Sequence, residues 1–432
     1  MLHRLRALFE RSYSLVRSGA LRLVGFALSV LVLAAASLAA IPAMIAASGD
    51  AAWGAIALGQ VIGTVGGVAV GYGWGWFGPA RVAQYDPTAR RTEYVESVIA
   101  RGVLAPPVCA IAAILAYVLA SSTPLFAVAG AVSATCMGLS ASWYFVGLSR
   151  PFMMFAIETI PRAAGTGAGV ILMTMGHSAL MGPLGMFCGL IAALAFSSIW
   201  ILWAAKREGA ASGNRRPLRT ILLLNRHGVA SALGSAAYIA APLAIVSVVA
   251  PSIQPAFALA DRVKGLVFVA SAPAAAVLQG WVPRASEAAR VRRANIALFS
   301  AGVFAVFLGV GTAAVAPGLV SWLGNGQISV SWIVVVLMAG CVAITLFQNV
   351  LERAALATFG RLRAAVKAVA LGSLVGLPLV GIGARQLGTA GAMAGVLAGL
   401  LASVAVELVT HLRVVREAHR SNASSQGSAA GE

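Results

Sequence analysis

The chain is a succession of apolar stretches, most of them about twenty residues or longer, separated by short polar connections. A helix needs about twenty apolar residues to cross the hydrocarbon of a bilayer, whereas a membrane strand needs about ten residues of alternating polarity. Inside lipid every backbone polar group must be paired within the protein, and a continuous helix does this by itself. The sequence therefore predicts an all-α, polytopic membrane protein.

Composition supports this class, because 60% of the residues are hydrophobic, only 10% are charged, and the mean hydropathy is +0.90. Such a chain has too little polar surface to cover a soluble globule. We expect about twelve transmembrane helices in two six-helix lobes. The expected spans cover residues 21–47, 54–78, 103–121, 124–148, 154–176, 183–205, 229–250, 256–282, 295–323, 329–351, 364–384 and 389–412.

A basic segment near the midpoint of the chain separates the first six spans from the last six. Basic loops stay in the cytoplasm, so this segment and both termini are expected there. The two halves also share a faint pattern about two hundred residues apart, with Pro42 and Gln60 in one and Pro242 and Asp261 in the other, which predicts a parallel pseudo-repeat. The expected parts are a cytoplasmic amphipathic arm (1–20), an N-terminal lobe (21–205), a basic linker (206–228), a C-terminal lobe (229–412) and a disordered tail (413–432).

The net charge of +18 does not indicate nucleic-acid binding, because most of the basic residues gather on the side expected to be cytoplasmic. One such group, in the loop before the third span, contains Arg81, Arg90, Arg91 and Arg101. The anionic lipids of the inner leaflet are a sufficient partner for this charge.

Cofactor and metal sites are not expected. The four cysteines lie inside expected spans without a CxxC spacing, and the five histidines are scattered along the chain. No phosphate-binding loop of the form GxxxxGK[ST] is present, which argues against ATP as the energy source.

Small residues mark two close helix contacts. Glycines repeat every fourth residue in the second span and again in the last, which predicts either simple close packing or a seam on which helices slide. Aromatic residues lie between the first set, and they indicate either an interfacial belt or a platform for stacking sugar rings. The glycines are Gly63, Gly67, Gly71 and Gly75, then Gly391, Gly395 and Gly399; the aromatic residues are Tyr72, Trp74, Trp76 and Phe77.

Several stretches resemble the Wzx-type polysaccharide flippases of the multidrug/oligosaccharidyl-lipid/polysaccharide exporter superfamily. The end of the fourth span, ASWYFVGLSRP at 141–151, resembles the W-[FY]-[FL]-x-G signature of that family. The order and spacing of the motifs carry the likeness, which extends over nearly the whole chain. The other matching stretches are AWGAIALGQ (52–60), GPARVAQ (78–84), FALADRVKGL (257–266), PAAAVLQGWVPRASE (273–287) and LGTAGAMAGVLAG (387–399).

The resemblance implies a transporter rather than an enzyme. Its cargo would be a polyprenyl-pyrophosphate-linked oligosaccharide, moved across the bacterial cytoplasmic (inner) membrane for the synthesis of a surface polysaccharide. Membrane lipids and the polysaccharide polymerase machinery are the other partners that it implies.

Charges at membrane depth are costly and are therefore the first candidates for a binding site. Glu158 and Arg162 are four residues apart on one helix face, so they either neutralise each other or bind substrate and ion. Asp261 and Lys264 can pair in the same way, which would leave Arg262 for the substrate or for interfacial anchoring. The predicted substrate cations are Arg162, Arg262, Lys264, Arg81 and Arg284; the ion-coupling candidates are Glu158 and Asp261; the sugar-stacking candidates are Tyr72, Trp74, Trp143 and Tyr144.

Other functions remain open at this stage. A cation-coupled drug antiporter of the same superfamily would need acidic groups in the first lobe, where Glu158 is the one acidic residue well inside an expected span. A flippase for lipid-linked peptidoglycan precursors is a closer alternative, although such proteins commonly have fourteen spans. A membrane glycosyltransferase or ligase would need a larger outside loop than this chain has.

Overall fold

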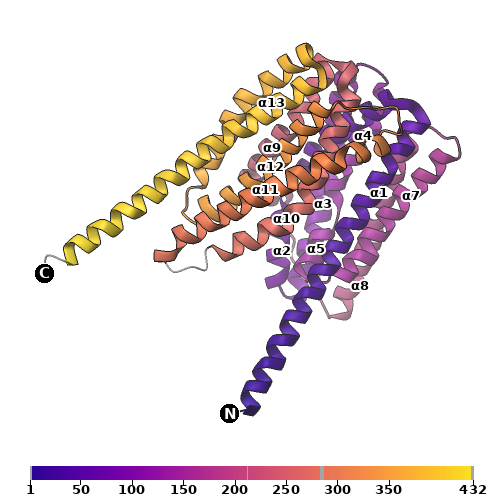
Figure 1. The fold of residues 1–432 in the computed structure, drawn as a ribbon. Coiled ribbons are helices and arrows are strands. Elements are labelled where there is room, and N and C mark those ends of the chain that lie inside the picture. Colours follow the sequence, from indigo (N-terminus) through magenta and orange to yellow (C-terminus); the bar gives the residue numbers. More distant parts are fainter. Residues whose placement is uncertain (1, 212, 283–286, 430–432) are drawn as a thin grey trace. The chain divides into compact units, whose positions relative to one another are not determined.

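The computed structural model describes residues 2–211, 213–282 and 287–429 (Figure 1). These residues form helices joined by turns and short connections, and none of them lies in a strand. The predicted all-α membrane fold is confirmed. Each of the twelve expected spans lies largely on helix, with a break inside the fourth, and eight stretches of the described residues are long and apolar enough to cross a membrane.

The chain divides into two compact units, Met1–Ala240 and Ala241–Glu432. Among the described residues, α9 continues into the second unit, so the first unit contains α1 to α8 and most of α9. Its helices are α1 (Leu2–Gly71), α2 (Trp74–Gln84), α3 (Pro87–Leu119), α4 (Pro124–Cys136), α5 (Ser142–Gly147), α6 (Pro151–Met154), α7 (Ile160–Thr174), α8 (Met181–Arg207) and α9 (Leu218–Val249), with a 3₁₀ turn at Met137–Leu139 and a π-helical turn at Phe155–Thr159.

The second unit repeats the use of long helices with short connections. It contains α10 (Gln254–Trp281), α11 (Glu287–Leu323), α12 (Trp332–Val350) and α13 (Leu362–Ala429), with a 3₁₀ turn at Pro251–Ile253 and a π-helical turn at Leu351–Leu356. A π-helical turn is a local widening of the helix that is frequent at functional sites. In the part of the chain that the structure describes, each unit has one such turn, and each turn contains a glutamate, Glu158 or Glu352.

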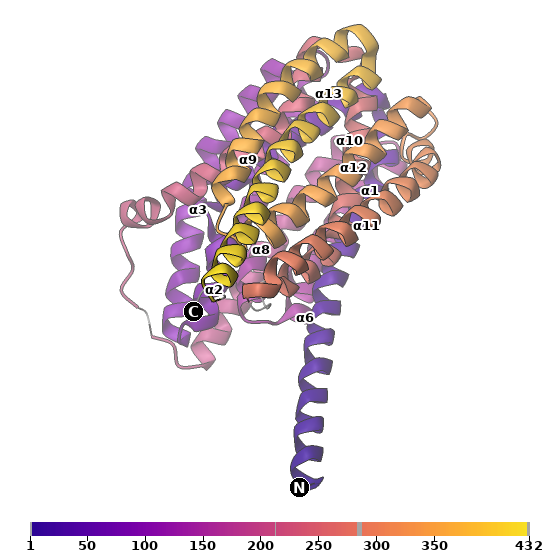
Figure 2. The ribbon, with the colours of Figure 1, turned by 60° about the vertical axis from the view of Figure 1, so that its left-hand side comes forward.

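Two of the helices are folded back on themselves at a glycine. In α1 the turn is at Gly49 (φ 84°, ψ 172°), and in α13 it is at Gly388 (φ 61°, ψ −141°). Positive φ is cheap for glycine and strained for other residues, so these two glycines allow a tight helical hairpin. Figures 1 and 2 both show the two arms of α13 side by side. Each of these helices thus supplies two of the expected spans.

Most of the repeated glycines form the predicted close helix contacts, whereas Gly75 has nothing within 4 Å of an added Cβ atom. A Cβ atom placed on Gly63 would collide with the backbone oxygen of Ala131 on α4, and one on Gly391 would collide with the backbone of Gly383 on the other arm of α13. The missing side chains therefore let the helix backbones touch, which is how helices associate inside lipid.

The expected boundaries of the parts stay predictions. α1 begins at Leu2 and continues through the rest of the expected arm (1–20) into the first span. The tail from residue 413 is helical as far as Ala429. Within it, Glu417 pairs at 2.8 Å with Arg361, which lies just before α13. The first unit extends to Ala240, beyond the basic linker.

Candidate functional site

The polar centre of the first unit is built around a break in the fourth span. After α4 the chain makes a 3₁₀ turn at Met137–Leu139 and restarts as α5 at Ser142. A break of this kind frees backbone groups that a helix would otherwise pair, and inside a membrane they need partners from the protein. The ASWYFVG motif lies directly after the break, so the motif and the polar groups belong to one structural feature.

Arg101 of α3 satisfies the carbonyl groups at this break. Its Nη1 donates to the oxygen of Ser140 at 2.8 Å and to that of Gly138 at 3.2 Å, and the residue is only 1% exposed. The guanidinium also lies 6.0 Å from the ring centre of Trp74 and 5.8 Å from that of Trp143, within the range of cation–π attraction. We expected Arg101 in a cytoplasmic loop, and the structure instead buries it within α3.

Glu158 binds the other side of the same break. Its carboxylate accepts from the Ser140 hydroxyl at 2.8 Å, the Ala141 amide at 2.9 Å and, from α8, the Ser197 hydroxyl at 3.0 Å. Arg162 lies one turn further along, with its Nη1 3.9 Å from Glu158 Oε2. The predicted Glu158–Arg162 pair is therefore formed. It adds a weak contact to a carboxylate that already has three donors.

Arg162 is the most accessible member of this group of buried charges. Its side chain is 17% exposed, against 2% for Glu158. Its Nη2 donates to the sulfur of Met137 at 3.6 Å, which is a weak acceptor. Around the break, two arginines thus face one carboxylate, and the buried charge that results is positive.

The predicted sugar-stacking residues mostly lie in the core of the first unit. Trp74, Trp143 and Tyr144 are each at most 5% exposed and pack with Tyr94 and Phe145. Tyr72 is partly buried, and its hydroxyl donates to the oxygen of Leu222 at 2.8 Å. In this conformation the three buried rings pack around Arg101 and α3, and their contact with sugar stays a prediction.

Arg81 belongs to a second polar cluster, near the start of α3. It pairs with Glu93 at 3.1 Å, and the same carboxylate accepts from Trp74 Nε1 at 3.1 Å. Arg216, from the segment between α8 and α9, binds Glu93 at 2.7 Å and Glu96 at 2.6 Å. Hydrogen bonding to Glu96, with the charges of both glutamates, raises the pKa of Arg216 above its ordinary value. The segment is thus fixed to α3.

The predicted charges of the second unit lie near the start of α10. Lys264 pairs with Asp261 at 2.6 Å, as the spacing indicated, and both side chains are about a quarter exposed or less. Arg262 has interactions of its own, and its role toward the substrate stays a prediction. Burial of a guanidinium favours such pairing. Arg284 lies outside the described residues.

The second unit contains a further polar cluster, which the sequence analysis did not identify. Glu407 on α13 is fully buried, and one of its oxygens accepts from Gln348 Nε2 at 2.9 Å. The same amide lies 3.3 Å from Glu352 Oε1. One turn beyond Glu407, His411 Nε2 lies 2.9 Å from Asn295 Oδ1. Two carboxylates therefore share one amide donor.

The fold can be compared with that of proteins of known structure. No family model matches the chain, and no curated protein matches its sequence. Among solved structures, an inward-facing multidrug resistance MATE family transporter of the MOP superfamily matches with a TM-score of 0.63, at 14% identity over 89% of this chain and 95% of that one. An outward-facing MATE structure matches with a TM-score of 0.56, at 14% identity over 92% and 95%.

A third match is a MOP superfamily transporter from Pyrococcus furiosus, described as having a binding pocket of reverse polarity that suggests a different function. Its TM-score is 0.54, at 14% identity over 91% of this chain and 95% of that one. At this identity the likeness concerns the fold. The chain has a MATE-like fold, and the matching structures are described as transporters.

Proposed function

We propose that the protein carries a polyprenyl-pyrophosphate-linked oligosaccharide across the bacterial cytoplasmic membrane, with both termini on the cytoplasmic side. The observation that supports this most strongly is the excess of positive charge buried around the break in the fourth span. Among the described residues around the break, Arg101 and Arg162 bring two positive charges and Glu158 one negative charge, so the polar centre of the first unit is suited to an anion. Guanidinium groups bind phosphate oxygens through their forked donors.

Arg162 is the residue that we assign to the pyrophosphate in the first unit. It is more exposed than Glu158, and its contacts with Met137 sulfur and Glu158 are long. An anionic group can therefore replace weak contacts with strong ones. In the second unit, the partly exposed Lys264 and the adjoining Arg262 are proposed for the same role, and Asp261 is proposed as an ion-coupling group.

The mechanism that we propose is alternating access. MATE structures with this fold exist in inward-facing and outward-facing forms. An inside-negative potential favours outward movement of an anion by about 2.3 kcal/mol per charge per 100 mV. The potential can thus give direction to the transport of an anionic lipid without ATP.

A drug antiporter is the second candidate, because the matching solved structures include multidrug transporters. Such a protein would bind cations and would need an available carboxylate. In the first unit Glu158 already accepts from three hydrogen-bond donors. Drug susceptibility that rises on deletion of the gene, with unchanged lipid-linked sugars, would favour this candidate.

The test uses cells that lack the protein. Lipid-linked oligosaccharides are extracted, and a membrane-impermeant sugar-modifying reagent applied to spheroplasts shows which leaflet holds them. We expect complete repeat units to accumulate, shielded on the inner side, and the wild-type gene to restore labelling. Completed units that are labelled from outside in the deletion strain would contradict the proposal.

A further inference from the structure

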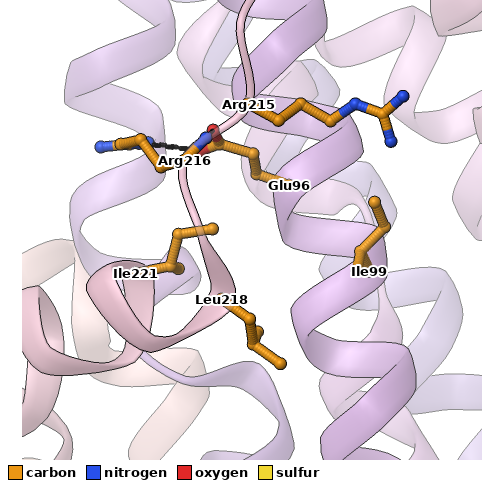
Figure 3. Close-up of a pocket in the computed structure, with 6 residues that line it drawn as sticks. All are labelled: Glu96, Ile99, Arg215, Arg216, Leu218 and Ile221. Carbon is orange, nitrogen blue, oxygen red and sulfur yellow. Dashed lines mark hydrogen bonds and ion pairs between the residues drawn. The ribbon is translucent and has the colours of Figure 1, made fainter.

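The first unit has a groove of about 330 Å³ between α3 and the segment that joins α8 to α9. Its size is at the small end of the range for ligand pockets, so it has room for a headgroup and the beginning of an acyl chain. The lining residues are Glu96, Ile99, Arg215, Arg216, Leu218 and Ile221 (Figure 3).

The expected third span, residues 103–121, places the groove where α3 leaves the hydrocarbon. α3 has 33 residues, which is about 50 Å of helix, whereas the hydrocarbon is about 30 Å thick. The first turns of α3 therefore extend into the headgroup region, and Ile99 belongs to the part near the boundary. Ile99 is 43% exposed, and with Leu218 and Ile221 it makes an apolar wall at this level.

The two arginines at the rim have different roles. Arg216 is committed to α3, because its backbone N–H donates to Glu96 at 2.6 Å and its guanidinium binds Glu93 and Glu96. Arg215 is exposed and has no hydrogen-bond or ion-pair partner among the described residues. Figure 3 shows the two side chains leaving the segment in opposite directions, with that of Arg215 on the side of Ile99.

The pairing at Arg216 has two consequences for a ligand. It compensates the carboxylate of Glu96, which would otherwise repel an anion at the groove. It also fixes the backbone next to Arg215, so that the unpaired guanidinium is held over the apolar wall. A cation above an apolar groove at headgroup level matches a lipid with a negative headgroup.

We propose that this groove binds an anionic phospholipid from the leaflet on the side of the basic connecting segments. The lipid phosphate lies on Arg215, and the first part of an acyl chain lies against Ile99, Leu218 and Ile221. This site is separate from the proposed translocation site at Arg162, and it does not depend on what the protein carries.

The test is native mass spectrometry of the purified full-length protein with phosphatidylglycerol or phosphatidylcholine of the same chain length. We expect preferential retention of phosphatidylglycerol. Arg215→Ala should weaken it about fivefold, since one basic residue near an anionic surface contributes about 1 kcal/mol. Ile99→Asp should also weaken the retention of phosphatidylglycerol, because it places a negative charge in the apolar wall that contacts the acyl chain. Arg416→Ala, which removes an exposed arginine from α13, is the matched control and should have no effect.

Three outcomes would overturn the assignment. Equal retention of phosphatidylglycerol by Arg215→Ala and Arg416→Ala would show that the lipid is attracted by the overall positive charge and not by this groove. Glycerol phosphate that competes as well as the intact lipid would show an anion site without a role for the acyl chain. Polyprenyl phosphate that displaces phosphatidylglycerol at equal concentration would assign the groove to the lipid carrier. Thermal unfolding of each variant, expected to match the wild type, confirms that the groove itself is intact.

Discussion

Each unit buries a glutamate inside the membrane, but the two glutamates are supplied with donors very differently. Glu158 in the first unit accepts from Ser140, Ala141 and Ser197 and lies beside Arg162. Glu407 in the second unit has one amide partner, which it shares with Glu352. Its other oxygen has no hydrogen-bond partner among the described residues.

The difference indicates different charge states. A buried carboxylate with several donors and a nearby arginine is stable as an anion. Two carboxylates that share one donor in a low-dielectric surrounding cannot both be ionised at low cost, so one of them holds a proton. Glu158 therefore supports the broken fourth span as the acceptor for three donors, whereas the Glu352–Glu407 pair would carry a single negative charge once one of the two carboxylates is protonated.

The largest effect is expected for Glu158→Ala. It removes the acceptor for three donors and leaves Arg101 and Arg162 without a countercharge, so we expect a loss of about 3–5 kcal/mol in the free energy of unfolding. Thermal unfolding in detergent and the amount of protein in the membrane measure it. Glu417→Ala removes an exposed carboxylate paired with Arg361 and is the control, with an expected change below about 1 kcal/mol. Equal stability of the two variants would refute the structural role of Glu158.

Arg101→Met should have the next largest effect. The change removes the donors to the carbonyl groups of Gly138 and Ser140, and bonds from a charged donor contribute about 1.5–3 kcal/mol. Arg91→Met, on the same helix, is the matched control because Arg91 makes one hydrogen bond, to Ala210 at 3.2 Å. If both variants unfold at the same temperature, Arg101 does not support the break.

The smallest effect is expected for Glu407→Gln. A neutral amide resembles a protonated carboxyl in shape and charge, so stability should change by less than about 1 kcal/mol. The same substitution at Glu158 should lower the stability more, because all three hydrogen-bond partners of that carboxylate are donors and the NH2 group of a glutamine would face one of them. Unfolding temperatures of the two Gln variants, compared side by side, test the assigned charge states. A larger loss for Glu407→Gln than for Glu158→Gln would reverse them.

The sequence predicted the helices and the local charge pairs well, because both depend on near neighbours. Span length follows from the apolar runs, and the Glu158–Arg162 and Asp261–Lys264 pairs follow from helical spacing. The close contacts at Gly63 and Gly391 follow from the four-residue repeat.

The features that the sequence did not predict depend on distant partners. From the sequence, Arg101 is grouped with Arg90 and Arg91 in a loop, and its carbonyl acceptors at the break are 37 and 39 residues away. Arg216 binds glutamates 120 and 123 residues away. Only the folded arrangement shows that Arg101 and Arg216 have hydrogen-bond partners, whereas Arg215 has none among the described residues. A small signal was available at Arg101, since Ser97 one turn earlier offers both a hydroxyl and a carbonyl oxygen to it.

The most direct test of the account is translocation by the purified protein in proteoliposomes, with a fluorescent polyprenyl-pyrophosphate oligosaccharide and an inside-negative potential. Wild-type protein should move the lipid to the outer leaflet. Arg162→Ala should reduce the rate at least tenfold, and Arg162→Lys should retain part of it because the charge remains but the forked donors are lost. Arg413→Ala, an exposed arginine of α13, should match the wild type. An unchanged rate in Arg162→Ala would contradict the proposed role of the positive charge buried in the first unit.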